Sequence, residues 1–205
     1  MGTTPANNVK DLNDMCLRLM QFIDARLDKS KFLVYITQVV GLLLRVPLLE
    51  PNNSLRDLDA FQPLLRNDQL MSSLSAEDKA LLGNVLIQTP AYNKSLKTKY
   101  KEAYLPAIEG TDKEVLSSIR EDPQRYQLPL AADDEQTPFP APTLILCGRQ
   151  DEVVGYRDSL RLLELYPRST FVVLDRGTHA LPVDENELFE ALVHNWLTRV
   201  HEWRG

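Results

Sequence analysis

The order of hydrophobic and polar residues predicts a helix and buried strands at the start of this chain. Over residues 11–27 the apolar side chains recur every three or four positions, which predicts an amphipathic helix. Two apolar runs follow, FLVYI at 32–36 and VVGLLLRV at 39–46, and each is typical of a buried strand. Only Thr37 and Gln38 separate the runs, too few residues for a parallel crossover, so we expect one continuous strand or a tight hairpin there.

The middle of the chain, from about residue 50 to 138, is polar, interrupted by prolines and helical in its periodicity. Two sequences in it, SAED at 75–78 and TDKE at 111–114, resemble capping boxes, in which a hydroxyl and a carboxylate bind free amides of a helix's first turn. They predict helices over about 76–87 and 112–120. This segment therefore predicts a helical lobe.

The last third predicts a β-α-β unit. TLILC at 143–147 and TFVVL at 170–174 are continuous apolar runs, and SLRLLELY at 159–166 between them has helical spacing. Two buried strands joined by a helix form a parallel pair, so the fold class is α/β. A closing helix after 184–187 is expected to pack on the sheet through one apolar face, formed by Leu188, Leu192, Trp196 and Val200.

Charge and hydropathy exclude several partners. The 23 Lys and Arg residues against 29 Asp and Glu give a formal net charge of -6, which argues against nucleic acid. The longest apolar stretch, 32–49, contains Gln38, Arg45 and Pro47, and therefore predicts protein core rather than a membrane span. The start of the chain lacks the basic and apolar pattern of a secretory signal, so we expect a cytoplasmic protein.

Cofactor motifs are absent from the sequence. Cys16 and Cys147 are the only cysteines and lie far apart, so they predict neither a zinc cluster nor a disulfide framework. The sequence contains no metal-ligand spacing, phosphate loop or dinucleotide fingerprint. We therefore expect no metal and no cofactor.

Two polar residues follow the predicted strands of the last third. Asp151 comes after the first strand and His179 after the second, and ligands of open α/β sheets bind beyond these carboxyl ends. A carboxylate that orients an imidazole is the acid and base part of a catalytic triad. The alternative is structural: Asp151 caps the next helix and His179 lies in a turn. Residue types and spacing alone favour this alternative.

The segment from Pro140 to Leu197 resembles the last two strands and helices of the α/β-hydrolase fold family, of the serine hydrolase type with a helical cap. In that family the acid follows the penultimate strand and the histidine the last one, and Asp151 and His179 occupy these positions. VVGLLLRVPLLEP resembles the strand that leads into the cap. The resemblance implies a hydrolase core in two parts, 1–49 and 139–205, around a cap at 50–138.

The chain departs from that family where the nucleophile belongs. The family carries it in a G-x-S-x-G turn, and no two of the eight glycines here are four positions apart. The turn would fall between FLVYI and VVGLLLRV, where only Thr37 and Gln38 stand. Cys147, within an apolar run, is interpreted as an unreactive core residue. We therefore expect a truncated chain without the nucleophile and without the first strands of the sheet.

Two functions remain open at this stage, and whether the chain is an enzyme remains open with them. One is hydrolysis of a small ester or amide substrate in a pocket covered by the cap, an activity of the ancestral protein that this chain has lost as written. The alternative is a non-catalytic relative that binds a small ligand or a protein partner; a degenerate fragment is a third possibility. Loss of the first strands would also expose an apolar sheet edge able to associate with a second copy.

Overall fold

The computed structural model describes residues 9–10, 14, 40–122, 124–125 and 138–204. Three parallel strands form a sheet in the order β1 (Leu42–Arg45), β2 (Thr143–Gly148) and β3 (Ser169–Leu174). The α/β class and the parallel β-α-β unit predicted from the sequence are confirmed. The helix predicted at 11–27, apart from Asp14, the strand at 32–36 and the junction at 37–38 lie outside the described residues.

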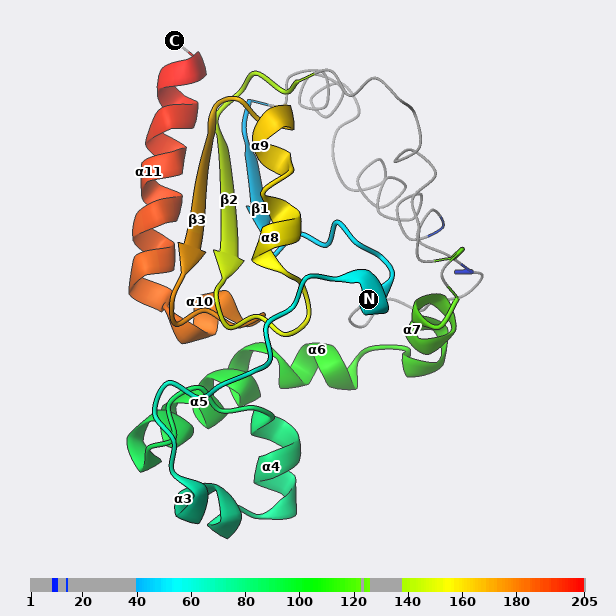
Figure 1. The fold of residues 1–205 in the computed structure, drawn as a ribbon, viewed down its shortest axis with the longest axis vertical. Coiled ribbons are helices and arrows are strands. Elements are labelled where there is room, and N and C mark those ends of the chain that lie inside the picture. Colours follow the sequence, from blue (N-terminus) through cyan, green and yellow to red (C-terminus); the bar gives the residue numbers. More distant parts are fainter. Residues whose placement is uncertain (1–8, 11–13, 15–39, 123, 126–137, 205) are drawn as a thin grey trace.

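Strand β2 lies at the centre of this sheet and all six of its residues are buried. Side chains alternate between the two faces of a strand. Leu144 and Leu146 pack into a cluster with side chains of α11 (Asn186–Arg204), whereas Ile145 and Cys147 pack with Leu162 and other side chains around α9 (Leu162–Leu165). Figure 1 shows the result: α11 covers one face of the sheet, and α8 (Tyr156–Ser159) and α9 cover the other.

The helices around the sheet differ in detail from their predicted bounds. The single helix expected at 159–166 is two short ones, α8 and α9. The closing helix α11 is preceded by a short helix, α10 (Leu181–Asp184). It packs on the sheet through Phe189, Leu192, Val193 and Trp196, while Leu188, expected on that face, is 46% exposed.

The segment between β1 and β2 forms a helical lobe beyond the carboxyl ends of the strands (Figure 1). Ser75 caps α4 by accepting a hydrogen bond from the Asp78 amide, as its capping box predicts, whereas Asp112 rather than Thr111 caps α7. Helix α4 ends at Leu82, earlier than predicted, because Gly83 takes a positive φ of 57°. The described elements of this segment are η1 (Asn53–Leu55), α3 (Asp68–Ser73), α4 (Ala76–Leu82), α5 (Pro90–Ala103), α6 (Leu105–Glu109) and α7 (Lys113–Arg120).

A small apolar cluster joins the lobe to the sheet layer. Leu82, Val85 and Leu96 of the lobe form this cluster with Ala180 and Val183, which lie around α10. A hydrogen bond of 2.7 Å from the Lys99 ammonium to the Val183 carbonyl oxygen adds a polar link. The lobe therefore rests on the turn that follows β3, the turn that also carries His179.

Candidate active site

Asp151 and His179 lie beyond the carboxyl ends of β2 and β3, which are neighbours in the sheet. The distance from Nδ1 of His179 to Oδ2 of Asp151 is 3.1 Å, within hydrogen-bond range. The Asp151 side chain is fully buried, whereas the His179 side chain is 46% exposed. The structure thus brings together the two residues that the sequence singled out, with the imidazole on the solvent side.

The Asp151 carboxylate is held in place by the backbone that follows it. Its Oδ1 accepts hydrogen bonds from the amides of Val153 at 2.8 Å and Val154 at 3.0 Å, which leaves Oδ2 for the imidazole. These two bonds to the following backbone resemble those of a helix cap, the structural role considered as the alternative for Asp151. The same carboxylate therefore stabilises its own turn and orients His179.

A second carboxylate holds the turn around His179. Oδ2 of Asp184 accepts hydrogen bonds from the Thr178 amide at 2.8 Å and from the Thr178 hydroxyl at 2.6 Å. Burial raises the pKa of Asp184, although the bonds from Thr178 act in the opposite direction. On the other side, the Arg45 guanidinium donates to the His179 carbonyl oxygen at 3.2 Å. Hydrogen bonds therefore fix the backbone around His179 at two points: the amide of Thr178 before it and its own carbonyl oxygen.

Two glycines allow the turns after β2 and β3 to touch. A Cβ atom on Gly148 would lie 2.4 Å from the carbonyl oxygen of Gly177, a distance that real Cβ atoms essentially never show. The same carbonyl accepts a hydrogen bond of 2.9 Å from the Gln150 amide. The contact between the turns brings Asp151 within reach of His179.

The pair can hold and move a proton. With Nδ1–H donating to Asp151, Nε2 of His179 has a free lone pair that can accept a proton. Among the described residues Nε2 has no hydrogen-bond partner. The imidazole therefore has the geometry that a general base requires, with no hydrogen-bonded nucleophile beside it in the described part of the chain.

His179 and Val153 line two cavities that adjoin the pair. The larger, of about 750 Å³, is bounded by the loop after β1 and by Arg120 at the end of α7. The smaller, of about 230 Å³, is bounded by the end of α4 and by Glu152. The larger cavity is within the size range of small-molecule sites in proteins.

A solved structure of another protein has a similar fold. The crystal structure of an alpha/beta superfamily hydrolase from Oenococcus oeni PSU-1 matches with a TM-score of 0.69 and 20% sequence identity, over 93% of this chain and 73% of that protein. This chain has the α/β-hydrolase fold. No protein-family model and no curated protein matches it. Because one fold carries many activities, the function has to be argued from the side chains.

Among the described residues of this α/β-hydrolase fold, neither Cys147 nor His194 supplies the nucleophile that a G-x-S-x-G turn would carry. Burial raises the pKa of the Cys147 thiol to about 11, so the thiol stays protonated and weakly nucleophilic near neutral pH. His194, on α11, binds the Glu190 carbonyl oxygen of its own helix. In the described part of the chain, His, Cys, Asp and Glu form no group of three that could hold a metal ion. No helix there is long and apolar enough to cross a membrane.

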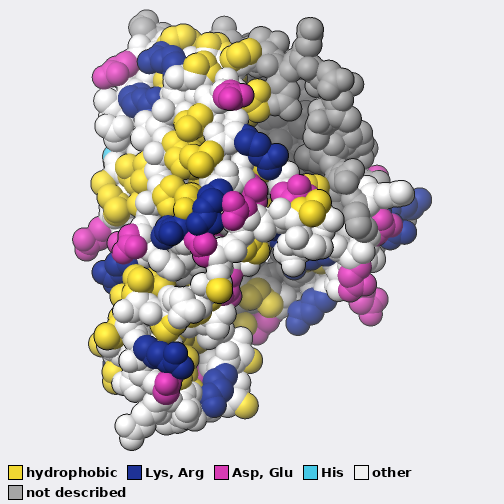
Figure 2. All heavy atoms as spheres, viewed as in Figure 1, with side chains coloured by type: hydrophobic (Ala, Val, Ile, Leu, Met, Phe, Trp, Pro, Cys, Tyr) yellow, Lys and Arg dark blue, Asp and Glu magenta, His cyan; other side chains and the backbone are white. Residues whose placement is uncertain are grey.

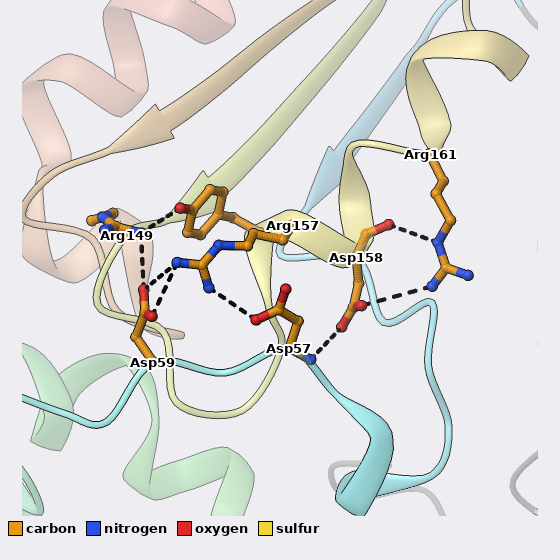
Figure 3. Close-up of polar contacts among 7 residues, drawn as sticks. Asp57, Asp59, Arg149, Arg157, Asp158 and Arg161 are labelled. Carbon is orange, nitrogen blue, oxygen red and sulfur yellow. Dashed lines mark hydrogen bonds and ion pairs between the residues drawn. The ribbon is translucent and has the colours of Figure 1, made fainter.

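A network of charges lies beside the site. Figure 2 shows basic and acidic side chains next to one another across the middle of the visible face. Arg157 binds Asp57 at 2.9 Å and Asp59 at 3.0 Å, and Arg149 binds Asp59 at 2.9 Å (Figure 3). Both guanidinium groups also lie 4.9 Å from the ring centre of Tyr156. The network joins the start of the lobe to α8 and to the residue after β2.

Sequence reasoning missed the residues that support His179 and line the larger cavity. The supporting residues, Thr178 and Asp184, are six positions apart, and the hydroxyl and carboxylate around a turn were a local signal that could have identified them. Arg45, Arg56 and Arg120 approach from distant segments. No local motif connects these arginines with His179.

Proposed function

We propose that this α/β-hydrolase-fold chain carries the acid and base part of a hydrolytic site, with His179 as general base and Asp151 as the group that orients it. The observation that supports this role is the hydrogen bond of 3.1 Å between a fully buried carboxylate and an imidazole exposed at two cavities. A purely structural aspartate and histidine pair has no need of an open cavity at the imidazole. The substrate class is a small ester or amide.

Residues 50–138 act in this proposal as a cap, and 1–49 and 139–205 as the two parts of the hydrolase core. Support comes from the position of the lobe beyond the carboxyl ends of the strands and from its contribution to both cavities. Residues of the lobe line each cavity together with His179: Arg120 lines the larger one and Asn84 the smaller one. A cap in this place limits the size of the ligand and reduces its contact with water.

The absence of a nucleophile turn limits the chemistry that the chain can perform as written. The 205 residues contain no G-x-S-x-G, so we infer that the chain as written forms no covalent acyl intermediate. This absence favours a second candidate function, a non-catalytic protein that keeps the cavities and binds a small ligand or a protein partner. A fluorophosphonate probe separates active from inactive chains, because it labels an activated serine covalently. We expect no labelling of the unmodified chain.

The decisive experiment restores the nucleophile. A strand, a turn carrying G-x-S-x-G and a helix are inserted between Ile36 and Thr37, and the strands that precede them in the hydrolase fold are added. Hydrolysis of p-nitrophenyl acetate by this protein should then depend on the pair. His179→Ala should abolish turnover, and Asp151→Asn should reduce kcat by about 10⁴-fold, as neutralising the acid of a catalytic triad does.

Matched controls test whether the loss is specific. His194→Ala removes another exposed histidine, on α11, and Asp175→Asn removes an aspartate just after β3 that, unlike Asp151, is exposed. Both controls should keep the activity of the restored protein, with circular dichroism showing that every variant is folded. Equal activity in the variants of Asp151 and His179 would make the pair structural and refute the proposed role.

A further inference from the structure

The two cavities that share His179 differ in charge. The larger one is lined by Arg56 and Arg120, and no Asp or Glu is among its described lining residues. The smaller one is lined by Glu152, whose two carboxylate oxygens accept bonds of 2.8 Å from the Asn84 side chain, and no Lys or Arg is among the lining residues that the structure describes. A ligand with one charged end therefore meets a different potential on each side of the imidazole.

Arg120 has unused binding capacity. It lies in the last turn of α7, its side chain is exposed at the cavity, and among the described residues its guanidinium has neither a hydrogen-bond nor an ion-pair partner. A guanidinium presents parallel N–H groups whose geometry matches the two oxygens of a carboxylate. Arg120 can therefore receive an anionic group without first breaking another contact.

Arg56 supplies positive charge in a fixed position. Its Nε donates to the Glu50 carbonyl oxygen at 2.8 Å, and its two terminal nitrogens donate to the carbonyl oxygens of Pro51 at 3.1 Å and Val153 at 2.8 Å. The Asn53 side chain accepts a further bond at 3.0 Å. All these acceptors are neutral, so the charge of Arg56 is held at the cavity without a carboxylate among its partners.

The rest of the larger cavity is mostly apolar. Its remaining walls include Val46, Leu48, Pro51, Val153 and Val154, with the side chains of Asn52 and Asn53 as the neutral polar part. Mostly apolar walls with two positive charges among the lining residues fit a molecule with an apolar body and a single anionic group. A phosphate with two charges would be matched less well, because four of the five N–H donors of Arg56 are in use and only Arg120, of these two arginines, has all its donors free among the described residues.

We propose that the larger cavity binds a small carboxylic acid, with its carboxylate at Arg120 and Arg56 and its apolar body toward His179. This inference rests on the proposed function, since it names the substrate class of the same site: an ester or amide that also carries a free carboxylate. Arg120 is then a residue that determines specificity and takes no part in the proton transfer.

The test uses the unmodified chain and two probes of nearly equal shape, 4-phenylbutyrate and its neutral amide, 4-phenylbutanamide. Isothermal titration calorimetry at pH 7 should show at least tenfold tighter binding of the acid. Arg120→Gln should weaken binding of the acid about tenfold, as expected for a lost hydrogen bond to a charged group, and leave binding of the amide unchanged. Arg120→Lys should restore part of the loss.

Arg66→Gln is the matched control. It removes the same charge from a residue of the lobe that lines neither cavity and that pairs with Asp68. This variant should bind the acid as the unmodified chain does. Equal weakening in both variants would assign the effect to net charge and overturn the inference.

The remaining outcomes also decide the matter. Equal binding of acid and amide, binding of neither probe, or full binding of the acid by Arg120→Gln would each overturn the carboxylate site. Inorganic phosphate that competes as well as 4-phenylbutyrate would overturn the requirement for an apolar body. None of these results depends on hydrolysis, so failure of the site is distinguishable from failure of the acid and base role of Asp151 and His179.

Discussion

Strand β2 and the helical lobe both contribute to the surroundings of His179, but they differ in how far their side chains are buried and hydrogen-bonded. Every residue of β2 is buried, whereas in α5, the longest described helix of the lobe, only Asn93 and Leu96 are buried among residues 90–102. Asp151 is held by two backbone amides of the turn after β2 and by the imidazole of His179, while the lobe contributes cavity walls with side chains such as Arg120, which has no partner among the described residues. Close packing sets the geometry of the pair, and an exposed surface sets which ligand reaches it.

The largest expected difference between these regions is in stability. Leu144→Ala empties a site in the centre of the sheet where the side chain is 0% exposed, and should lower the free energy of unfolding by about 3 kcal/mol. Leu65→Ala removes the same atoms from the lobe at a side chain that is 50% exposed, and should cost less than about 1 kcal/mol. Urea unfolding at pH 7, followed by circular dichroism, measures both.

Equal losses in the two leucine variants would show that the lobe is as tightly packed as the sheet layer. The slope of the urea transition provides the control. An unchanged slope means that each variant changes stability alone, without altering the surface exposed on unfolding.

The next difference is in the response to alkaline pH. Burial raises the pKa of Cys147, in β2, from 9.0 to about 11, and raises the pKa of Tyr92, in α5, from 10.0 to about 12. In each case the unfolded chain loses the proton first, so stability falls as pH rises from the unfolded pKa to the folded one. The windows are therefore pH 9 to 11 for the thiol and pH 10 to 12 for the phenol.

Variants at the two positions separate these contributions. Cys147→Ser should remove an alkaline loss of up to about 2 kcal/mol, whereas Tyr92→Phe should remove no more than about 1 kcal/mol because water screens its half-exposed hydroxyl. Urea unfolding at intervals from pH 8 to 12 covers both windows and gives both profiles. Profiles parallel to that of the unmodified chain would contradict the assignment of these groups.

The smallest expected effect is at the boundary between the two regions. Asp59→Asn weakens the ion pairs with Arg149 and Arg157, which lie on the surface and join the start of the lobe to the sheet layer (Figure 3). Surface pairs contribute little and are screened by salt, so Tm should fall by less than about 3 °C at low ionic strength. At 1 M NaCl the difference should vanish. A loss that persists in salt would indicate packing rather than charge.

Much of the sheet layer was predictable from the sequence. The β-α-β unit over the last third depends on local hydrophobic runs, and the strand bounds differ from the predicted ones by one residue at the start of β3 and at the end of β2. The bounds of α4 and the break between α8 and α9 were not predictable, because a glycine conformation and local backbone hydrogen bonds decide them.

The sequence by itself also determined the pairing of Asp151 with His179. Adjacent parallel strands end at the same edge of a sheet, so two residues that follow them are brought together by topology alone. Only the tertiary structure placed Arg56 and Arg120 at the cavity of His179. These residues come from three distant segments, and no local pattern encodes the packing of the lobe that unites them. Charge at a cavity is a property of that packing, whereas the pairing of Asp151 with His179 is a property of the strand order.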